Sequence, residues 1–466
     1  MQVGTILPDH GFKRGKKVDA GKTKTLYRVK GRPDLLWVEN KDKITAHDKK
    51  EFTKSFDTKA GYATNTTCRV FELLEAAGIE TAYVCQVSPT AFICKRLDMI
   101  KLEVVARRSA VGSFTDRNPH LQKEKGEEPH RFHSLVREFF LKTSNGNLSV
   151  NGEPLVKNLR GLVKDPDTKK FKMGIVDDPF IPDPYNELGW ALVNPKLPKW
   201  HEKYDLGQSI DPRFVLRNQT ADLLKIDELL RKIFYVLEKA WAVLEMRLID
   251  FKLEFGYDMA GNLVVGDVID NDSWRIRLFD WTDYSKQAFR DGENLDEVER
   301  KYGYVSRLAN QFRIPKQVIV FWRGSDKDDC FDKIRQEIES QAKGTIEIVD
   351  IVLSGHKKTD KSLKMLNSIM SKYLGGGFII TNVGRSNGLG PIVSAHTSWP
   401  VMSIAATFES DPNDIFSSIN MPSDTPHTAT PYGKLAFLSA LNHLSLNNPV
   451  AYMMRQNVIE SLDDQY

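Results

Sequence analysis

The sequence predicts a protein of the α/β and α+β classes with two domains. In the first part of the chain, strand-like runs paired as hairpins alternate with single helices; in the last part, strand, polar turn and helix repeat in order. The length of 466 residues also exceeds what one ordinary hydrophobic core accommodates. We therefore expect one domain at 1–312 and a second at 313–466, with the boundary near Phe312 to Lys316.

Residues Lys17 to Asn40 carry the first predicted hairpin, because GKTKTLYRVK leads into LLWVEN through a Gly-Arg-Pro turn. The stretch G-K-T-K at 21–24 resembles the end of a P-loop, but its spacing from Gly15 is one residue too long and a strand follows. Such a hairpin can still cover nucleotide phosphates with Lys22 and Lys24. The alternative is that both lysines are only solvated.

Two helices are predicted in the first domain. One spans Thr64 to Ala77 with Gly78 as its stop, and the other spans Ala221 to Met246 with apolar residues spaced for one buried face. Strands are expected at 79–83 and 91–94.

An extended run from Met99 to Arg107 leads to Gly112 and Ser113. A guanidinium, backbone N–H groups and a hydroxyl at a strand exit can together hold a phosphate. The segment from Lys142 to about His201 differs in character, because it is rich in Pro, Gly, Asn, Asp and Lys. It predicts an irregular, partly mobile insertion at about 143–200.

The stretch from Asp250 to Arg275 combines strand-like sequence with many chargeable side chains. Apolar residues alternate with Lys252 and Glu254, and a second run ends at Asp267, which predicts a hairpin about a loop near Gly261. Carboxylates on adjacent strands suit a magnesium ion that carries phosphates. The alternative is a solvated face whose charges pair with each other.

The second domain reads as a parallel sheet with right-handed crossovers. Strands are predicted at 317–322, 346–353 and 378–382, and helices at 330–343 and around Leu363 to Met370. Ligands of such sheets bind beyond the carboxyl ends of the strands. The polar residues at these ends are Ser325, Asp328, His356, Lys357, Arg385, Ser386 and Asn387. His356 is a candidate for proton transfer, although a single loop histidine is often incidental.

Composition limits the classes of partner. Apolar residues make up 41% and charged residues 27% of the chain, and the net charge is only +4, so we expect no nucleic-acid or membrane partner. Four cysteines without C-x-x-C spacing suit a reducing compartment. The N-terminus carries no secretion-type apolar core, and no run of about twenty apolar residues occurs. We therefore expect a cytoplasmic protein.

Several motifs resemble known families. GKTKTLY, KDKITAHD, LDMIKLEVVARRSAVGSF, DFKLEFG and GDVIDNDSWR are similar to SAICAR synthetase, the purine-pathway ligase, and RGSDKD, SGHKK and GRSNGLGP are similar to animal aminoimidazole ribonucleotide (AIR) carboxylase. In this order they make up the bifunctional animal enzyme of purine biosynthesis. The resemblance implies a SAICAR synthetase-like ATP-binding fold, with a hairpin-rich lobe and an α/β lobe, followed by a three-layer α/β carboxylase-like domain.

The resemblance also implies chemistry: ATP and Mg²⁺ as cofactors, aspartate, imidazole ribonucleotides and carbon dioxide as substrates, and a homo-oligomer, an octamer in the family. For the ligase it implies ATP or phosphate binding at Lys22, Lys24 and Glu103, magnesium at Glu254 and Asp267, the reacting end at Lys252 and Asp48, and the ribonucleotide phosphate at Arg107, Ser113 and Arg275. For the carboxylase it implies catalysis at His356 and Lys357 and substrate binding at Ser325, Asp328, Arg385, Ser386 and Asn387.

Three loops of the second domain depart from the carboxylase pattern at Lys327, Lys358 and Asp424. Small or neutral residues are usual there, and glycine in place of Asp424 would let backbone approach a phosphate. We therefore expect weak or absent carboxylation of AIR. Two alternatives stay open: a divergent ligase that joins another amine or acid, and a C-terminal domain that serves only assembly.

Overall fold

The structure is a computed structural model that describes residues 10–45, 53–124, 127–165, 168, 170–290, 292–328, 331–341, 344–384 and 386–463. The chain divides into two compact units. Unit 1 comprises Met1–Glu75 and Ile79–Phe312, and unit 2 comprises Arg313–Tyr466 with Ala76–Gly78. The division after Phe312 falls within the boundary range expected from the sequence.

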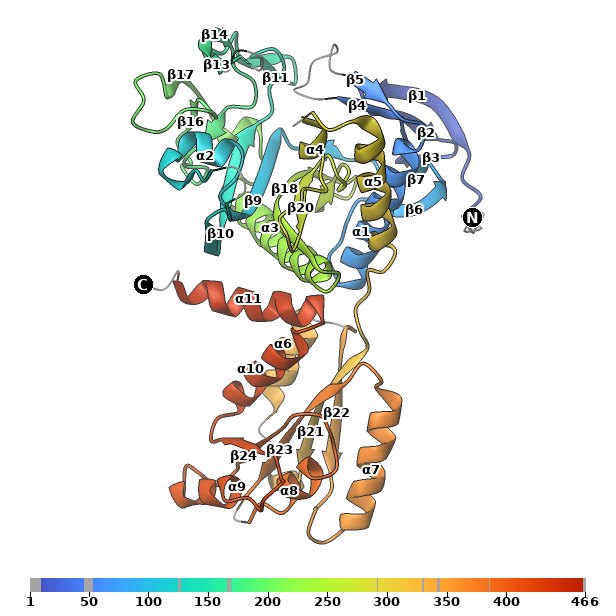
Figure 1. Cartoon of the computed structure of the whole chain (residues 1–466), viewed down its shortest axis with the longest axis vertical. Coiled ribbons are helices and arrows are strands. Elements are labelled where there is room, and N and C mark those ends of the chain that lie inside the picture. The colour runs from blue at the N-terminus through green and yellow to red at the C-terminus, as the bar shows by residue number, and fades with distance from the viewer. Residues whose placement is uncertain are drawn as a thin grey trace. The chain divides into compact units, whose positions relative to one another are not determined.

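The first lobe of unit 1 is a five-stranded antiparallel sheet with the order β1-β2-β3-β7-β6 (Figure 1). Its strands are β1 (Arg14–Ala20), β2 (Lys24–Val29), β3 (Arg32–Asn40), β6 (Tyr83–Ser88) and β7 (Ala91–Lys95). β2 and β3 form the predicted hairpin, which is confirmed, and Gly31 has the φ of 74° that this tight turn requires. Val29, Leu35 and Ile93 are buried together on one face.

The helix α1 (Lys59–Ala76) begins five residues before the predicted start. The strand predicted at 79–83 is wrong before Tyr83, where β6 begins. Thr81 makes only an isolated bridge to Val265, because the side chain of Glu75 already accepts hydrogen bonds from the Thr81 N–H and hydroxyl at 2.8 and 2.7 Å.

A nine-stranded sheet forms the second lobe, with the main order β17-β16-β15-β10-β9-β18-β19 and with β20 and β8 paired to β18. Its strands are β8 (Asp98–Met99), β9 (Leu102–Ser109), β10 (Arg131–Leu141), β15 (Phe180–Ile181), β16 (Trp190–Val193), β17 (Asp205–Ile210), β18 (Met246–Tyr257), β19 (Leu263–Gly266) and β20 (Trp274–Leu278). Unit 1 also contains β4 (Lys43–Thr45), β5 (Thr53–Ser55), α2 (Ser113–Arg117), α4 (Gln287–Arg290) and α5 (Leu295–Ala309).

The long helix α3 (Gln219–Ala242) packs against β18 and β9 (Figure 1). Its apolar face is buried as the spacing predicts, and Phe234 stacks on Phe251 of β18 with ring centroids 5.2 Å apart. The helix ends four residues before the predicted end at Met246. Glu245 has a φ of 61°, and β18 starts immediately after it.

The prediction that the insertion at 143–200 is irregular is wrong. It contains the hairpins β11 (Leu148–Val150) with β12 (Glu153–Val156) and β13 (Arg160–Lys164) with β14 (Phe171–Ile175), while β15 and β16 join the nine-stranded sheet. The turn-forming residues mark tight turns rather than irregular chain: Asn151 and Gly152, for example, have φ of 52° and 85° between β11 and β12.

The hairpin of β18 and β19 is confirmed. Glu254 lies opposite Gly266 in the antiparallel register, and the loop turns at Gly261, whose φ is 87°. The Asp258 carboxylate accepts hydrogen bonds from the N–H groups of Ala260 and Asn262, both at 2.9 Å, which fixes the loop. The hairpin therefore fixes where Asp267, the next residue after β19, leaves the sheet.

Unit 2 is a five-stranded parallel sheet with the order β22-β21-β23-β24-β25, so the predicted parallel sheet is confirmed. Its strands are β21 (Gln317–Arg323), β22 (Ile346–Val352), β23 (Gly377–Val383), β24 (Val401–Ala405) and β25 (Thr428–Thr430). Its helices are α6 (Asp332–Gln341), α7 (Thr359–Lys372), α8 (Leu389–Ser394), α9 (Phe416–Ile419), α10 (Gly433–Leu444) and α11 (Pro449–Asp463).

Helices cover both faces of this sheet and make three layers. On one face Val320 and Trp322 pack in a cluster with Leu366 of α7 and Val393 of α8. The alternate residue Phe321 points to the opposite face and stacks on Phe331 with centroids 4.3 Å apart. The strand order reverses between β21 and β23, so the ends of these strands form the crevice where α/β sheets bind ligands.

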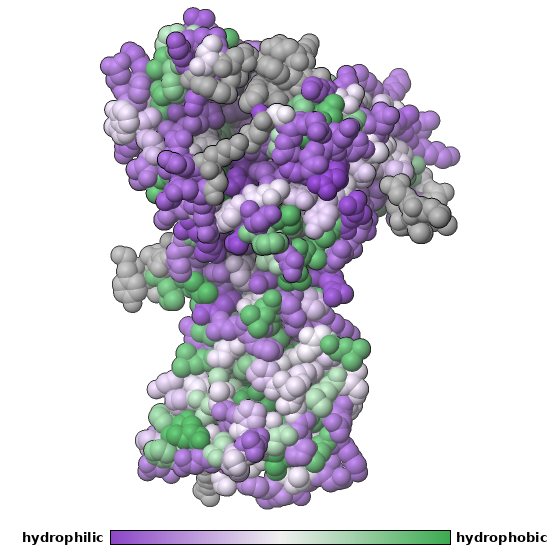
Figure 2. Space-filling view, in the orientation of Figure 1, coloured by the Kyte–Doolittle hydropathy of each residue, from purple (hydrophilic) through white to green (hydrophobic). Residues whose placement is uncertain are grey.

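No helix in the described part of the chain is long and apolar enough to cross a membrane. The face of unit 1 that Figure 2 shows is mostly hydrophilic.

Candidate active site

Unit 1 contains a cavity of about 290 Å³ between the two sheets and the segment that follows β19. Most of its lining side chains are charged or polar, as a site for a charged ligand requires. They are Thr23, Lys24, Asn40, Lys59, Lys252, Asp267, Asp270, Asp272, Ser273, Lys286 and Arg290, together with Val268.

Lys24 and Asp267 form an ion pair in this cavity. Burial disfavours the charge of Lys24, but the carboxylates of Asp267, Asp270 and Glu254 together outweigh burial and raise the lysine pKa, with Asp267 contributing most. Burial likewise opposes ionisation of Asp267, and Lys24 nevertheless lowers its pKa. Both groups are therefore charged at neutral pH, and the sheet of the first lobe is joined electrostatically to the hairpin of the second.

Two further ion pairs involve residues that the sequence singled out. Lys252 of β18 lies 2.7 Å from Glu103 of β9, and Lys142 pairs with Glu254. Burial opposes the charge of Lys252, but Glu103 raises its pKa, with Glu254 and Asp267 adding to the effect. Lys252 is thus a cation surrounded by three carboxylates.

Asp270 and Asp272 add two carboxylates to the lining of the cavity, and the sequence predicted only part of their surroundings. Asp272 accepts a hydrogen bond of 3.0 Å from the Tyr302 hydroxyl and lies 3.4 Å from Lys59 and 3.5 Å from Lys286. Burial opposes ionisation of Asp272, but these two lysines lower its pKa. Burial and the charge of Asp272 together raise the pKa of Asp270 to about 6. Lys59 is far from Asp272 in the sequence, so no local pattern pairs them.

Lys22 lies in the exposed turn between β1 and β2, and unlike Lys24 it does not line the cavity. Asp48 lies outside the described residues.

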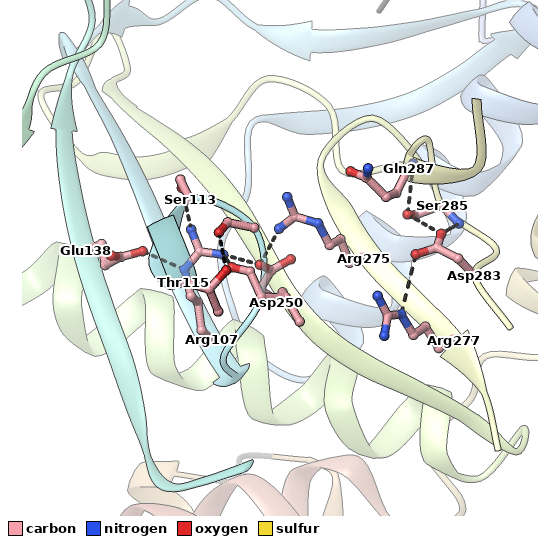
Figure 3. A network of polar contacts seen from close by, with 12 residues as sticks. Arg107, Ser113, Thr115, Glu138, Asp250, Arg275, Arg277, Asp283, Ser285 and Gln287 are labelled. Carbon is pink, nitrogen blue, oxygen red and sulfur yellow. Dashed lines mark hydrogen bonds and ion pairs between the residues drawn. The ribbon is translucent and has the colours of Figure 1, made fainter. Parts of the chain in front are cut away.

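The second predicted cluster, Arg107, Ser113 and Arg275, is brought together beside β9 and β18 (Figure 3). Arg107 donates to the Ser113 hydroxyl at 3.4 Å, and both Arg107 and Arg275 bind Asp250. The Arg275 guanidinium lies against Gly112, where a Cβ would approach it to 2.6 Å. A side chain at 112 would displace this guanidinium, and the φ of 62° at Gly112 also favours glycine.

The side chain of Arg107 is too buried for it to act mainly as a ligand contact. Its side chain is 4% exposed, and Figure 3 shows it between Glu138 and Asp250, whereas the side chain of Arg275 is 20% exposed. Glu138 also binds Arg117. Glu138 was not predicted from the sequence. The available signal was a carboxylate in the otherwise buried end of β10, a position that charged residues rarely occupy without a partner.

In unit 2, the ends of β21, β22 and β23 carry the predicted residues. The Asn387 side chain is buried, donates to Ser403 at 2.7 Å and to Ser418 at 3.0 Å, and accepts from the Gly390 N–H at 2.9 Å. His356 is exposed, and its ring lies against Gly388, where a Cβ would meet Nε2 at 1.9 Å. The structure therefore brings the loops after β22 and β23 together.

The other predicted residues of unit 2 are exposed or not described. Ser325, Lys357 and Ser386 are exposed, whereas Arg385 and the side chain of Asp328 lie outside the described part of the chain.

Comparisons with known proteins agree with this division. The family model for SAICAR synthetase matches residues 17–164 and 203–307, and the model for AIR carboxylase matches residues 317–462. The chain is 31% identical to "Multifunctional protein ADE2" of Gallus gallus over 97% of this chain and 95% of that protein. This chain belongs to the SAICAR synthetase family and carries a fused AIR carboxylase domain.

A second relative has the same arrangement. The "Bifunctional phosphoribosylaminoimidazole carboxylase/phosphoribosylaminoimidazole succinocarboxamide synthetase" of Drosophila melanogaster is 30% identical over 96% of this chain and 93% of its own length. Among solved structures, "SAICAR synthetase (Type-2) in complex with ADP" is 23% identical, covers 64% of this chain and 99% of that chain, and has a TM-score of 0.45.

The SAICAR synthetase match leaves out residues 165–202, most of which belong to the insertion at 143–200. In the AIR carboxylase domain, the divergent residues Lys327 and Lys358 are exposed at the ends of β21 and β22. Asp424 has a φ of 62°, the left-handed conformation that glycine favours. The backbone at this position therefore keeps a glycine-like conformation although the side chain is charged.

Proposed function

We propose that unit 1 is an ATP-dependent ligase that joins the amine of aspartate to the carboxylate of carboxyaminoimidazole ribonucleotide. The observation that supports this proposal is a cavity in which lysines pair with carboxylates, near the cluster of Arg107 and Arg275, in a chain of the SAICAR synthetase family. The product is a purine precursor. The γ-phosphoryl group of ATP is transferred to the carboxylate, which forms an acyl phosphate and releases ADP. The aspartate amine then attacks the acyl carbon, phosphate leaves, and the nitrogen loses a proton to give the amide.

In this proposal the lysines of the cavity screen the negative charge that accumulates when two anionic substrates meet ATP. Lys24 is placed for the nucleotide phosphates and Lys252 for the reacting carboxylate. Both are held by carboxylates, Asp267 and Glu103, and are therefore fixed before substrate arrives. Lys22 lies in the exposed turn between β1 and β2, and we propose that it contacts an ATP phosphate from there.

Two carboxylates at the β18–β19 hairpin are suited to binding a magnesium ion. Glu254 and Asp267 are hard oxygen donors at the end of one hairpin, and no group of three metal-binding side chains occurs in the described part of the chain. Mg²⁺ commonly takes one or two protein carboxylates and completes its shell with phosphates and water. When bound, the ion neutralises phosphate charge. Lys142 forms an ion pair with Glu254 and Lys24 with Asp267, so both lysines would have to share these carboxylates with the metal ion.

We assign the ribonucleotide phosphate to Arg275 and Ser113. Arg275 is partly exposed, and its guanidinium can form two parallel hydrogen bonds to a phosphate. Arg107 is enclosed by Glu138 and Asp250, so its contribution is to hold Ser113 and to orient Asp250 beneath Arg275.

For unit 2 we propose an AIR carboxylase site with His356 and Lys357 managing carbon dioxide and the ring proton. Ser325, Asp328, Arg385, Ser386 and Asn387 are proposed to bind the ribonucleotide. The added charges of Lys327, Lys358 and Asp424 should make this activity weak. We also propose that the protein is a cytoplasmic homo-oligomer, an octamer, which light scattering of the full chain would test.

The deciding experiment measures ADP release by the full chain with aspartate and carboxyaminoimidazole ribonucleotide, against a panel of other amines and acids. The Lys252→Met variant should lose activity, and Lys157→Met, at an exposed position of the insertion, should not. Release that requires a different amine or acid would replace this proposal with the divergent ligase.

A further inference from the structure

The turn at 194–197 lies in the segment that the SAICAR synthetase match leaves out, yet it is firmly held. The buried Asn194 accepts a hydrogen bond from the Lys196 N–H at 2.9 Å and donates to the Leu162 carbonyl at 2.8 Å. Leu197 is 2% exposed and anchors the other side. The direction in which Lys196 leaves the backbone is therefore fixed by the fold.

The same turn is tied to the arginine cluster. Arg117 donates to the Pro195 carbonyl at 2.6 Å and binds Glu138, which in turn binds Arg107. A continuous chain of hydrogen bonds thus joins the insertion to the predicted phosphate site. The Lys196 ammonium lies 3.7 Å from Asp116, and its side chain is 46% exposed, so it can reach a ligand.

Within the described part of the chain, the ion pairs around Lys196 contain more cations than carboxylates. One group joins Arg107, Arg117 and Arg275 to Glu138 and Asp250, and a second joins Lys164 and Lys196 to Asp116. This leaves an excess of two positive charges, which matches a phosphate monoester dianion. Burial lowers the pKa of Lys196, and although Asp116 opposes this effect, the nearby Arg117, Arg275 and Arg107 add to it, so the pKa stays below its ordinary value.

We propose that Lys196 is a further substrate-binding residue of unit 1, contributed by the insertion, that contacts the ribonucleotide phosphate together with Arg275. This inference rests on the proposed ligase function. It assigns a binding role to a segment whose composition alone indicated only loop structure.

The test compares Lys196→Ala, Lys196→Arg and the control Lys199→Ala in the full chain. Lys199 is an exposed lysine three residues away, so the control removes the same charge from the same segment. We expect Lys196→Ala to raise the KM for carboxyaminoimidazole ribonucleotide about tenfold, the effect of one charge-assisted hydrogen bond. The KM for ATP should stay unchanged, and Lys196→Arg should keep most of the wild-type affinity.

A second measurement, calorimetric titration with ribose 5-phosphate, does not depend on ligase activity. Lys196→Ala should weaken this binding, whereas Lys199→Ala should not. If both alanine variants bind ribose 5-phosphate as the wild type does, the assignment of Lys196 is wrong even where ADP release is normal. If the wild type releases no ADP but the ribose 5-phosphate result holds, the ligase proposal fails and the phosphate contact of Lys196 stands.

Discussion

Lys24 of β2 and Asp267 of the segment after β19 form an ion pair across 243 positions of the sequence. The pair joins the hairpin lobe to the acidic hairpin, and the cavity lies beside it. Because each member holds the other in its charged form, the site presents a fixed cation and a fixed anion before any ligand binds.

Glu254→Gln should lower ligase turnover by more than about tenfold, because the amide lacks the charge that a magnesium ion requires. The fold should survive, since glutamine is nearly the same size. ADP release at saturating substrate measures the effect. Glu153→Gln, at an exposed position of β12, is the matched control, and ADP formation equal to wild type in Glu254→Gln would remove Glu254 from the proposed metal site.

Arg275→Lys should weaken binding of the phosphorylated substrate and leave ATP binding nearly unchanged, because lysine cannot form the paired hydrogen bonds of a guanidinium. The two dissociation constants are measured by calorimetry. An equal loss of both affinities would instead assign Arg275 to the nucleotide.

Arg107→Ala should act mainly on stability. Its removal leaves Glu138 and Asp250 with one cation fewer in a buried network, a change that typically lowers the free energy of unfolding by about 3–5 kcal/mol. Thermal unfolding of the full chain would show this as a lower melting temperature of unit 1. A variant with wild-type stability but poor substrate affinity would show that Arg107 acts as a direct ligand.

We expect the folding stability of unit 2 to decrease at acidic pH because of His427. Neither ring nitrogen has a hydrogen-bond partner among the described residues, and burial lowers the pKa of His427 to about 4 from 6.5. Between these values the unfolded chain binds a proton that the folded chain does not, so stability falls as pH falls from 6.5 to 4. His427→Leu should reduce this dependence in chemical denaturation series. His396→Leu, which removes an exposed histidine of the same unit, should keep it.

Asp424→Gly should stabilise unit 2 by up to about 1 kcal/mol, because glycine adopts a φ of 62° without the strain of a side chain. If the charge of Asp424 also repels substrate phosphate, this variant should increase carbon dioxide incorporation into AIR by the full chain. Wild-type incorporation at the rate usual for the family would contradict the proposed weakness of the site.

The sequence by itself determined the local elements and the class of each unit. Alternating apolar residues in β18 and β19, turn residues at Gly31 and Gly261, and the strand–turn–helix repeat after Lys316 act over a few positions, and their prediction was confirmed. The family motifs were likewise readable in order.

Only the tertiary structure decided which charges meet. The partners Lys142 and Glu254, or Lys59 and Asp272, lie 112 and 213 positions apart, and no spacing rule connects side chains brought together by sheet pairing. The insertion shows the same limit: its composition indicated turns correctly but not that β15 would pair with β10, which places Lys196 near Arg275. Long-range pairing depends on the burial of whole surfaces rather than on local preference, and it is therefore settled by the fold.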